Sequence, residues 1–307
     1  MRALLVVNPN ATTTSERRRD VLATALRSEI DLHVVQTRRR GHAADLARTA
    51  GSEGFGVVVA LGGDGTVNEV VNGLLTDGPS AEVPALAVVP GGSTNVFARA
   101  IGLPRDPIDA TSVLLEALRE HRTRTIGLGR MRGRWFTFCA GIGLDAEVVR
   151  RVERARQHGK TSSKGLYLRS TIGQYFAGTD RERPLITLKQ PGAESVEQLA
   201  MAIVQNTSPW TYLGGRGVNP SPEASFDTGL DLMALRALRL PSTLRTAAQI
   251  LSAQPDPHGR RIYRVHDADE LTLVAEKPLA VQVDGDYIGE HTELVLRSEP
   301  NALRVVI

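Results

Sequence analysis

The chain has 307 residues, a hydrophobic fraction of 41%, an aromatic fraction of 4% and a formal net charge of +3. This length is enough for two domains, and the absence of aromatic residues between the basic runs disfavours a nucleic-acid-binding protein. No segment approaches the ~20 apolar residues of a membrane span, and the first residues do not resemble a signal peptide, so we expect a cytoplasmic protein. The single cysteine, Cys139, excludes an internal disulfide, and its apolar neighbours predict a buried thiol.

The first third alternates short apolar runs with amphipathic stretches. Strands are expected at 2–7, 31–37, 56–63 and 84–92, and helices within 15–29, 42–50 and 66–75. Continuously apolar strands separated by helices indicate a parallel sheet built from βαβ units. Ligands of such sheets bind outside the carboxyl ends of the strands, which is where the glycine-rich and polar segments fall.

The segment GGDGTVNE, residues 62–69, has the composition of a phosphate-binding turn. Its glycines let the backbone approach a ligand closely, and the helix that follows presents free N–H groups. Thr66 and Glu69 match a capping box for that helix. Asp64 would repel a phosphate unless a divalent cation or a substrate hydroxyl lay between them, which indicates a metal-dependent phosphoryl site. A simple tight turn with Glu69 as a cap explains the same residues.

From about residue 122 the pattern changes to strands and hairpins, which predicts a mostly antiparallel β domain. Two helical stretches interrupt it, around 145–177 and 241–254. The segment GIGLDAE, 141–147, resembles a dinucleotide-binding turn, but no acidic residue follows about 20 residues later to bind a ribose. We therefore interpret its glycines as structural and keep Asp145 as a site candidate.

Residues 150–176 combine basic side chains with leucine, tyrosine and phenylalanine. This composition predicts a segment that rests on a membrane surface, with its basic residues toward anionic head groups. A helix that packs on the core and keeps a solvated basic face is the alternative.

Six segments in the order NPNA, GHAADLA, LGGDGTVNEVVNGLL, PGGSTNVFARAIGLP, GIGLDAEVV and VDGD resemble the diacylglycerol kinase catalytic family, which comprises bacterial soluble lipid kinases related to sphingosine kinases. The resemblance implies an α/β plus β fold. Residues 1–126 would form a parallel-sheet nucleotide domain like that of NAD kinases, to which a last strand at about 299–307 returns. Residues 127–298 would form a mostly antiparallel β-sandwich for the lipid, with ATP and Mg²⁺ between the two domains.

The resemblance also implies roles for individual residues. Asp284 of the VDGD segment would be the general base on the lipid hydroxyl, and Asp227 would bind Mg²⁺. Asp284-Gly285 between two alternating strands is equally a hairpin signal, and a hairpin tip would hold the carboxylate out into a cleft. The residues expected at the nucleotide are Asn8, Thr37, Gly62, Gly63, Asp64, Gly65, Thr66, Glu69, Ser93 and Asn95.

Three departures from the family pattern leave contacts open. Asp286 replaces the usual glutamate, Val96 replaces an acid after GSTN, and NPNATTT lacks the glycine and lysine often found after the first Asn-Pro. The expected function is an ATP- and Mg²⁺-dependent lipid kinase that transfers the γ-phosphoryl group to a lipid hydroxyl, with diacylglycerol as the substrate and phosphatidic acid as the product. A kinase for a soluble substrate, like NAD kinases or phosphofructokinases, and a non-catalytic lipid-binding homologue are the alternatives. We expect peripheral contact with an anionic membrane and no nucleic-acid partner; a homodimer stays open.

Overall fold

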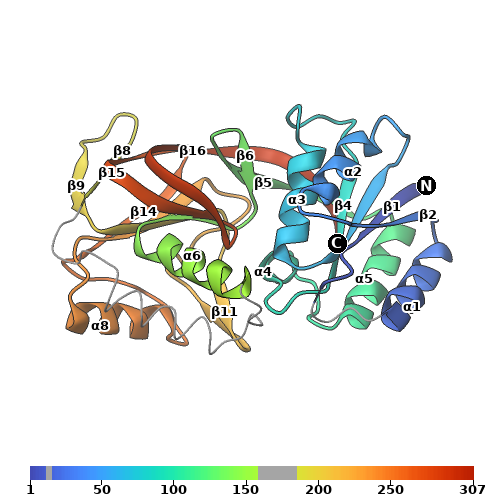
Figure 1. The fold of residues 1–307 in the computed structure, drawn as a ribbon, viewed down its shortest axis with the longest axis horizontal. Helices are drawn as coiled ribbons and strands as arrows, with labels where there is room; N and C mark the ends of the chain where they lie inside the picture. Colours follow the sequence, from blue (N-terminus) through green and yellow to red (C-terminus); the bar gives the residue numbers. More distant parts are fainter. Residues whose placement is uncertain (12–15, 158–184) are drawn as a thin grey trace. The chain divides into compact units, whose positions relative to one another are not determined.

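The computed structural model describes residues 1–11, 16–157 and 185–307. Within these residues, no helix is long and apolar enough to cross a membrane. The chain divides into two compact units, Met1–Leu128 with Pro300–Ile307, and Gly129–Glu299 (Figure 1). Two strands carry the chain between them, β5 (Thr123–Met131) and β16 (Asp286–Val306). The sequence places the first boundary two residues earlier, after residue 126.

The first unit contains a parallel sheet with the strand order β2-β1-β3-β4-β16. Every neighbouring pair runs parallel, which confirms the predicted βαβ architecture. β3 and β4 are buried along their whole length, because helices cover both faces of the sheet. The strands are β1 (Arg2–Val7), β2 (Asp31–Gln36), β3 (Val57–Gly62) and β4 (Ala85–Pro90).

Helices flank this sheet. α1 and α5 share a hydrophobic cluster with β1 and β3, to which Leu26 and Leu114 contribute fully buried side chains. α2 and α3 pack so closely that a Cβ on Gly73 would collide with the backbone of Ala44. Neither α4 nor α5 is among the helices expected from the sequence. The helices are α1 (Glu16–Arg27), α2 (His42–Ala50), α3 (Asp64–Leu74), α4 (Val96–Ala100) and α5 (Pro107–Arg119).

The second unit is antiparallel and rich in β structure, as predicted, with the strand order β14-β13-β10-β7-β15-β16. β15 (Glu270–Val283) pairs with β8 through Thr272–Ala275 and with β7 through Val281–Val283, so one long strand serves two parts of the sheet. The other strands are β6 (Arg134–Phe136), β7 (Cys139–Ile142), β8 (Ile186–Lys189), β9 (Val196–Leu199), β10 (Met201–Gln205), β11 (Thr211–Leu213), β12 (Arg216–Val218), β13 (Leu230–Leu235) and β14 (Ile262–Ala268).

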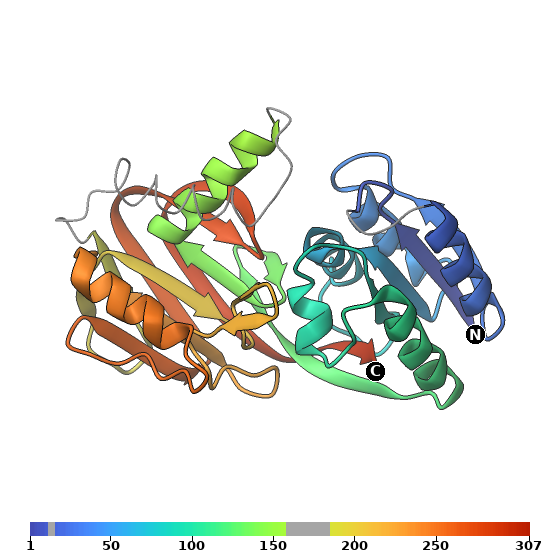
Figure 2. The same cartoon turned by 90° about the horizontal axis from the view of Figure 1, so that it is seen from below.

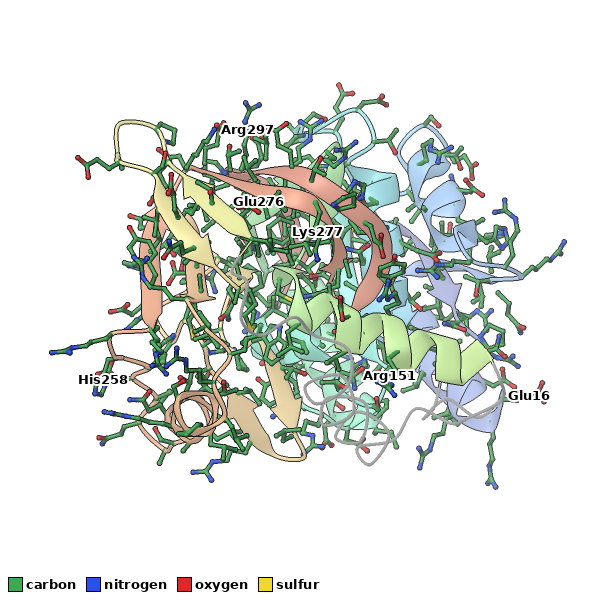
Figure 3. The ribbon with its side chains drawn as sticks, turned by 60° about the vertical axis from the view of Figure 1, so that its left-hand side comes forward. Glu16, Arg151, His258, Glu276, Lys277 and Arg297 are labelled. Carbon is green, nitrogen blue, oxygen red and sulfur yellow. The ribbon has the colours of Figure 1, made fainter. Side chains whose placement is uncertain are left out.

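Among its described residues, this unit carries the helices α6 (Leu144–Gln157) and α8 (Leu240–Ile250) (Figure 2). The helix predicted at 145–177 is confirmed as far as Gln157, with Arg151 exposed on α6 (Figure 3), and the rest of that prediction lies outside the described residues.

The glycines that precede α6 are structural, as predicted. β7 pairs antiparallel on both sides, so the segment 141–147 does not belong to a βαβ unit and the dinucleotide interpretation is wrong. Gly143 has a φ of +87° and makes the turn into α6. Asp145 lies in the first turn of this helix.

Candidate functional site

The carboxyl ends of the parallel strands gather several of the predicted nucleotide residues. Asn8, which follows β1, donates its backbone N–H to the carbonyl of Leu61 at 3.0 Å and its side-chain amide to Thr66 Oγ1 at 3.0 Å. Thr37, which follows β2, donates its N–H to the carbonyl of Val7 at 2.8 Å. The loops after β1, β2 and β3 therefore lie together at one edge of the sheet, as the sequence predicts for a ligand site.

The glycine turn after β3 leaves the start of α3 without a side-chain cap. α3 begins at Asp64, and its N-cap residue, Gly63, makes no side-chain capping bond. The N–H groups of Thr66 and Val67 both donate to the carbonyl of Gly63, at 2.9 and 3.1 Å. Gly65 is exposed, and a Cβ built on it would meet no atom within 4 Å. A Cβ on Gly92, by contrast, would approach Gly63 Cα to 2.7 Å, so the two glycine-rich loops touch. Glycines stand on both sides of Asp64, so the backbone at this helix start is open to a close approach by an anion, which the helix dipole favours there.

The loop after β4 is held in shape by its own asparagine. Asn95 is buried and has a φ of +50°. Its Oδ1 accepts the N–H of Gly92 at 2.8 Å and its Nδ2 donates to the carbonyl of the same residue at 2.8 Å. The side chain of Asn95 thus closes the loop, whereas Ser93 stays exposed on it. Asp64 joins this loop to the glycine turn, because its Oδ1 accepts the N–H of Phe97 at 3.1 Å.

The predicted capping box is wrong. α3 begins at Asp64, earlier than expected, so both Thr66 and Glu69 lie inside the helix. The carboxylate of Glu69 instead accepts the N–H of Gly41 at 2.8 Å and that of Ala43 at 3.2 Å. Glu69 therefore caps the start of α2, where its negative charge also faces the positive end of the helix dipole.

In the second unit, Asp284 and Gly285 connect β15 to β16 as a two-residue turn. Their φ values of +48° and +81° are those of a type I′ turn, which confirms the hairpin interpretation. Cys139, in the neighbouring strand β7, is buried as predicted.

The carboxylate of Asp284 is folded inward and only 6% exposed, so the expectation of a carboxylate held out into a cleft is wrong. Its Oδ2 accepts the N–H of Thr137 at 2.7 Å and the Oγ1 hydroxyl of Thr137 at 2.9 Å. Its Oδ1 accepts the N–H groups of Phe138 and Cys139, both at 3.0 Å. The reason is that the connection from β6 to β7 turns three successive N–H groups toward one point, which suits a carboxylate.

Burial raises the pKa of the Asp284 carboxyl above its ordinary value, while the donors from residues 137–139 oppose this by stabilising the anion. Three of these donors are backbone groups and cannot leave without moving the chain. The hydroxyl of Thr137 can rotate away. The sequence does not indicate that Thr137 contacts the candidate residue Asp284, because the two lie 147 positions apart.

Asp227 is exposed, and its backbone N–H donates to Ser225 Oγ at 3.2 Å. Over the described ranges, the group of histidine and acidic side chains close enough to share a metal ion consists of Glu223, Asp231 and His266, within 4.8 Å of one another. The predicted metal ligand Asp227 is not part of this group.

The departures from the family pattern at residues 286 and 96 have local consequences. Asp286 is half-buried, and one of its carboxylate oxygens lies 3.7 Å from a guanidinium nitrogen of Arg134. Val96 is 2% exposed and begins α4, so an apolar contact stands where the family pattern has an acid.

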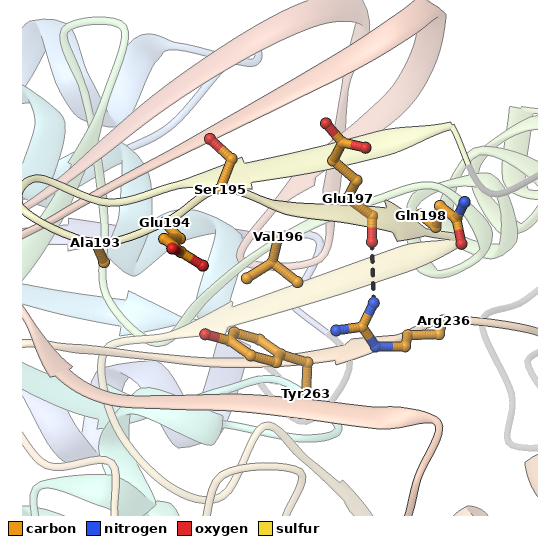
Figure 4. A pocket seen from close by; sticks show the side chains of 8 residues that line it. All are labelled: Ala193, Glu194, Ser195, Val196, Glu197, Gln198, Arg236 and Tyr263. Atoms are coloured by element: carbon orange, nitrogen blue, oxygen red, sulfur yellow. Dashed lines mark hydrogen bonds between the residues drawn. The ribbon is translucent and has the colours of Figure 1, made fainter.

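A shallow hollow beside β9 and β14 contains none of the predicted site residues (Figure 4). Arg236 donates to the carbonyl of Glu197 there at 3.1 Å, and its guanidinium lies 5.9 Å from the ring centre of Tyr263. These contacts belong to the surface of the second unit and give no reason to place phosphoryl chemistry in the hollow.

Comparison with known proteins identifies the family. The sequence model of the family "Diacylglycerol kinase catalytic domain" matches residues 2–131. The diacylglycerol kinase of Bacillus subtilis (strain 168) is 29% identical over 255 residues, which cover 81% of this chain and 77% of the relative. The "Probable lipid kinase YegS-like" protein of Chromohalobacter salexigens is 31% identical over 260 residues, which cover 83% of this chain and 77% of the relative. The chain belongs to the diacylglycerol kinase catalytic-domain family. As a member of this family, the protein is a kinase.

Solved structures support the same fold. A crystal structure from Bacillus anthracis str. Sterne aligns with 99% of this chain and 96% of its own at a TM-score of 0.80 and 23% identity. A second structure, titled as a diacylglycerol kinase from the same organism, has a TM-score of 0.73 and 20% identity over the same shares. An NAD kinase from Archaeoglobus fulgidus solved with ATP aligns at a TM-score of 0.56 and 14% identity, with 100% of this chain and 94% of its own covered. This likeness concerns the fold alone.

Proposed function

We propose that the protein transfers the γ-phosphoryl group of ATP to the hydroxyl of a lipid, with diacylglycerol as the substrate and phosphatidic acid as the product. The observation that carries the proposal is the glycine turn at the start of α3, where the N-cap Gly63 makes no side-chain capping bond and Gly65 is exposed, in a chain of the diacylglycerol kinase family. Two relatives whose names state a lipid or diacylglycerol kinase cover most of the chain and support the choice of substrate class.

The first unit supplies the proposed phosphate site. Backbone N–H groups at the start of α3 donate to phosphate oxygens, and Gly65 leaves room for their approach. Ser93 is exposed on the adjoining loop and reaches the nucleotide from there, while Asn95 fixes the loop. Asp227 is the proposed ligand of Mg²⁺, which when bound would neutralise negative charge on the phosphoryl oxygens.

Asp284 is the proposed general base. The lipid hydroxyl replaces the Thr137 hydroxyl as a donor to Oδ2. The backbone N–H groups of residues 137–139 keep the carboxylate in place. As the lipid oxygen forms its bond to the γ-phosphorus, its proton passes to Oδ2 and the bond to the β–γ bridging oxygen breaks, which releases ADP. The raised pKa of the buried carboxyl makes it a better proton acceptor than an exposed aspartate.

The test is a panel of substrates incubated with labelled ATP and Mg²⁺, with analysis of the phosphorylated products. The panel contains diacylglycerol, monoacylglycerol, a sphingoid base, a polyprenol, NAD and a sugar phosphate. Label in a lipid, most strongly in diacylglycerol, supports the proposal. Label in NAD or the sugar phosphate alone would replace it with a soluble-substrate kinase. Lipid binding without transfer to any substrate, across several Mg²⁺ concentrations, would indicate a non-catalytic homologue.

A further inference from the structure

The second unit gathers its exposed apolar side chains on two neighbouring elements. In the part of this unit that the structure describes, the large apolar side chains that are exposed are Leu213, Leu240 and Leu244, at 53%, 41% and 61%. Leu213 ends β11, and the other two lie one turn apart on α8. Figures 1 and 2 both draw α8 beside β11. Asn219, directly after β12, donates its N–H to the carbonyl of Ile250 at the end of α8 at 2.9 Å.

α8 exposes leucine side chains, whereas a surface helix ordinarily turns its large apolar side chains toward the core. Thr246 is its one buried residue, and Ile250 packs partly against the core cluster beneath it. Leu240 and Leu244 recur at a spacing of four and therefore share a face, which differs from the face of Thr246 and Ile250. Leu240 and Leu244 therefore contribute little to the core of this unit.

The charges around these leucines are positive. Arg216, Arg239 and Arg245 are exposed on the two elements, and neither 211–218 nor 239–251 contains an acidic residue. Arg261 adds a further cation, because its guanidinium donates to Ser242 Oγ on α8 at 3.1 Å.

An acidic side chain near the end of α8 is already engaged. Asp256 lies 3.4 Å from His258, whose labelled side chain is seen beside α8 in Figure 3, and its other carboxylate oxygen bonds to Arg264 at 3.2 Å. The exposed leucines therefore share these two elements with exposed arginines.

We infer that α8 and the hairpin of β11 and β12 form a docking surface for an anionic lipid bilayer. Leucines beside arginines on a surface helix match an interfacial membrane contact, in which the apolar side chains enter the acyl boundary and the cations meet phosphate groups. A second copy of the chain is a poor occupant, because a two-fold contact through this face would bring arginine against arginine. The residues of this α8–hairpin face are Leu213, Arg216, Arg239, Leu240, Leu244 and Arg245.

The choice of a bilayer rests on the proposed lipid kinase function, because a diacylglycerol substrate lies in a membrane. The contact itself does not depend on catalysis, so it is measured without ATP. Full-length protein is mixed with vesicles of phosphatidylcholine alone or of phosphatidylcholine and phosphatidylglycerol in equal parts, and the bound fraction is measured by flotation at low and high salt. We expect binding to the anionic vesicles that weakens as salt is raised.

Two double variants separate the apolar and the electrostatic contributions. Leu240→Ser with Leu244→Ser should lower binding to anionic vesicles about tenfold or more at both salt concentrations, because less apolar surface enters the bilayer. Arg239→Gln with Arg245→Gln should lower it by a similar factor at low salt only. The matched controls lie in the first unit, where Val21 and Ile108 are 56% and 55% exposed: their serine variants should bind like the unmodified chain.

The results overturn the inference if the unmodified protein binds neither vesicle, or if the α8 variants and the controls bind equally. If the protein binds no vesicles but associates with itself, and the leucine variants abolish that association, the face is a protein contact instead. Failure of the proposed function looks different, because it appears as an absence of phosphorylation of short-chain diacylglycerol dispersed without a bilayer. Vesicle binding that persists in that case leaves the docking surface standing.

Discussion

The dipeptide Asp-Gly occurs at both candidate sites and adopts opposite structures there. Asp64-Gly65 follows a parallel strand and begins α3, and Gly65 lies open to solvent. Asp284-Gly285 joins two antiparallel strands, and both residues have a positive φ. The carboxylate of Asp64 is half-exposed, whereas that of Asp284 is buried among four donors.

The difference lies in what the surrounding strands offer. A parallel strand must be followed by a crossover, so its last turn feeds a helix and leaves N–H groups for a ligand. An antiparallel pair closes in a tight turn, and the aspartate at its tip is within reach of the neighbouring strand connection. The first site is therefore open and built from backbone, while the second is closed and built around one charge.

The largest expected effect comes from Asp284→Asn, which tests whether the closed site depends on its charge. The asparagine side chain has an NH₂ group in place of one carboxylate oxygen. That group would face either the N–H of Thr137 or the N–H groups of Phe138 and Cys139, so buried hydrogen-bond donors would point at one another. We expect a loss of about 3 kcal/mol in unfolding free energy and loss of kinase activity. Chemical denaturation measures the first and product formation the second.

Two variants separate stability from catalysis at this site. Asp286→Asn, next to the turn and half-buried, should change the unfolding free energy by less than about 1 kcal/mol. Thr137→Val removes the hydroxyl donor and keeps the side-chain shape, so it should slow turnover less than Asp284→Asn does. If Asp284→Asn leaves the unfolding free energy unchanged, the four hydrogen bonds to this carboxylate do not stabilise the protein in solution.

The next effect contrasts two glycines of the open site. A Cβ on Gly62 would lie 2.5 Å from Thr66 Oγ1, whereas one on Gly65 meets nothing within 4 Å. Gly62→Ala should therefore destabilise the fold by about 2 kcal/mol. Gly65→Ala should stabilise it by up to about 1 kcal/mol, because alanine favours the helix, while it weakens ATP binding by crowding the phosphate site. Thermal unfolding measures the changes in stability, and nucleotide titration measures the change in ATP binding. If Gly65→Ala leaves ATP binding unaffected, the phosphates do not bind beside Gly65.

The sequence predicts the local parts of the fold well. The four parallel strands of the first unit lie within two residues of their expected bounds, because buried strands between helices leave a strong apolar pattern. α5 was within reach as well, since Asp106 and Pro107 are an N-cap and first-turn signal, and the Asp106 carboxylate accepts the N–H of Ile108 at 2.8 Å.

Long-range partners are beyond what the sequence can give. Nothing near Glu69 indicates that its carboxylate binds Gly41 and Ala43 rather than its own helix. In the same way, the inward turn of Asp284 depends on three N–H groups about 145 positions earlier. Motifs name the residues of a site, but side-chain direction follows from sheet pairing that leaves no local signal.

Glu69→Gln gives a smaller effect and tests whether charge or hydrogen bonding caps α2. Glutamine keeps one acceptor but loses the negative charge beside the positive end of the helix, so we expect a loss of about 1 kcal/mol in unfolding free energy. The loss should shrink in high salt if charge is the cause. A loss that does not depend on salt would assign it to the missing second acceptor.

The smallest effect is a pH dependence set by Asp231. Burial raises the pKa of this carboxyl, although the N–H of Asp267 and the ring of His266 oppose the shift. A raised pKa means that the carboxyl favours folding while it is protonated: the contribution is full below the unfolded pKa of about 4 and is lost as the pH rises through the folded value. Asp231→Asn removes this titration. As the pH rises from the acid side, the unfolding free energy of the unmodified protein should therefore fall relative to that of the variant. If the difference between the two is constant with pH, the Asp231 carboxyl titrates alike in the folded and unfolded chains.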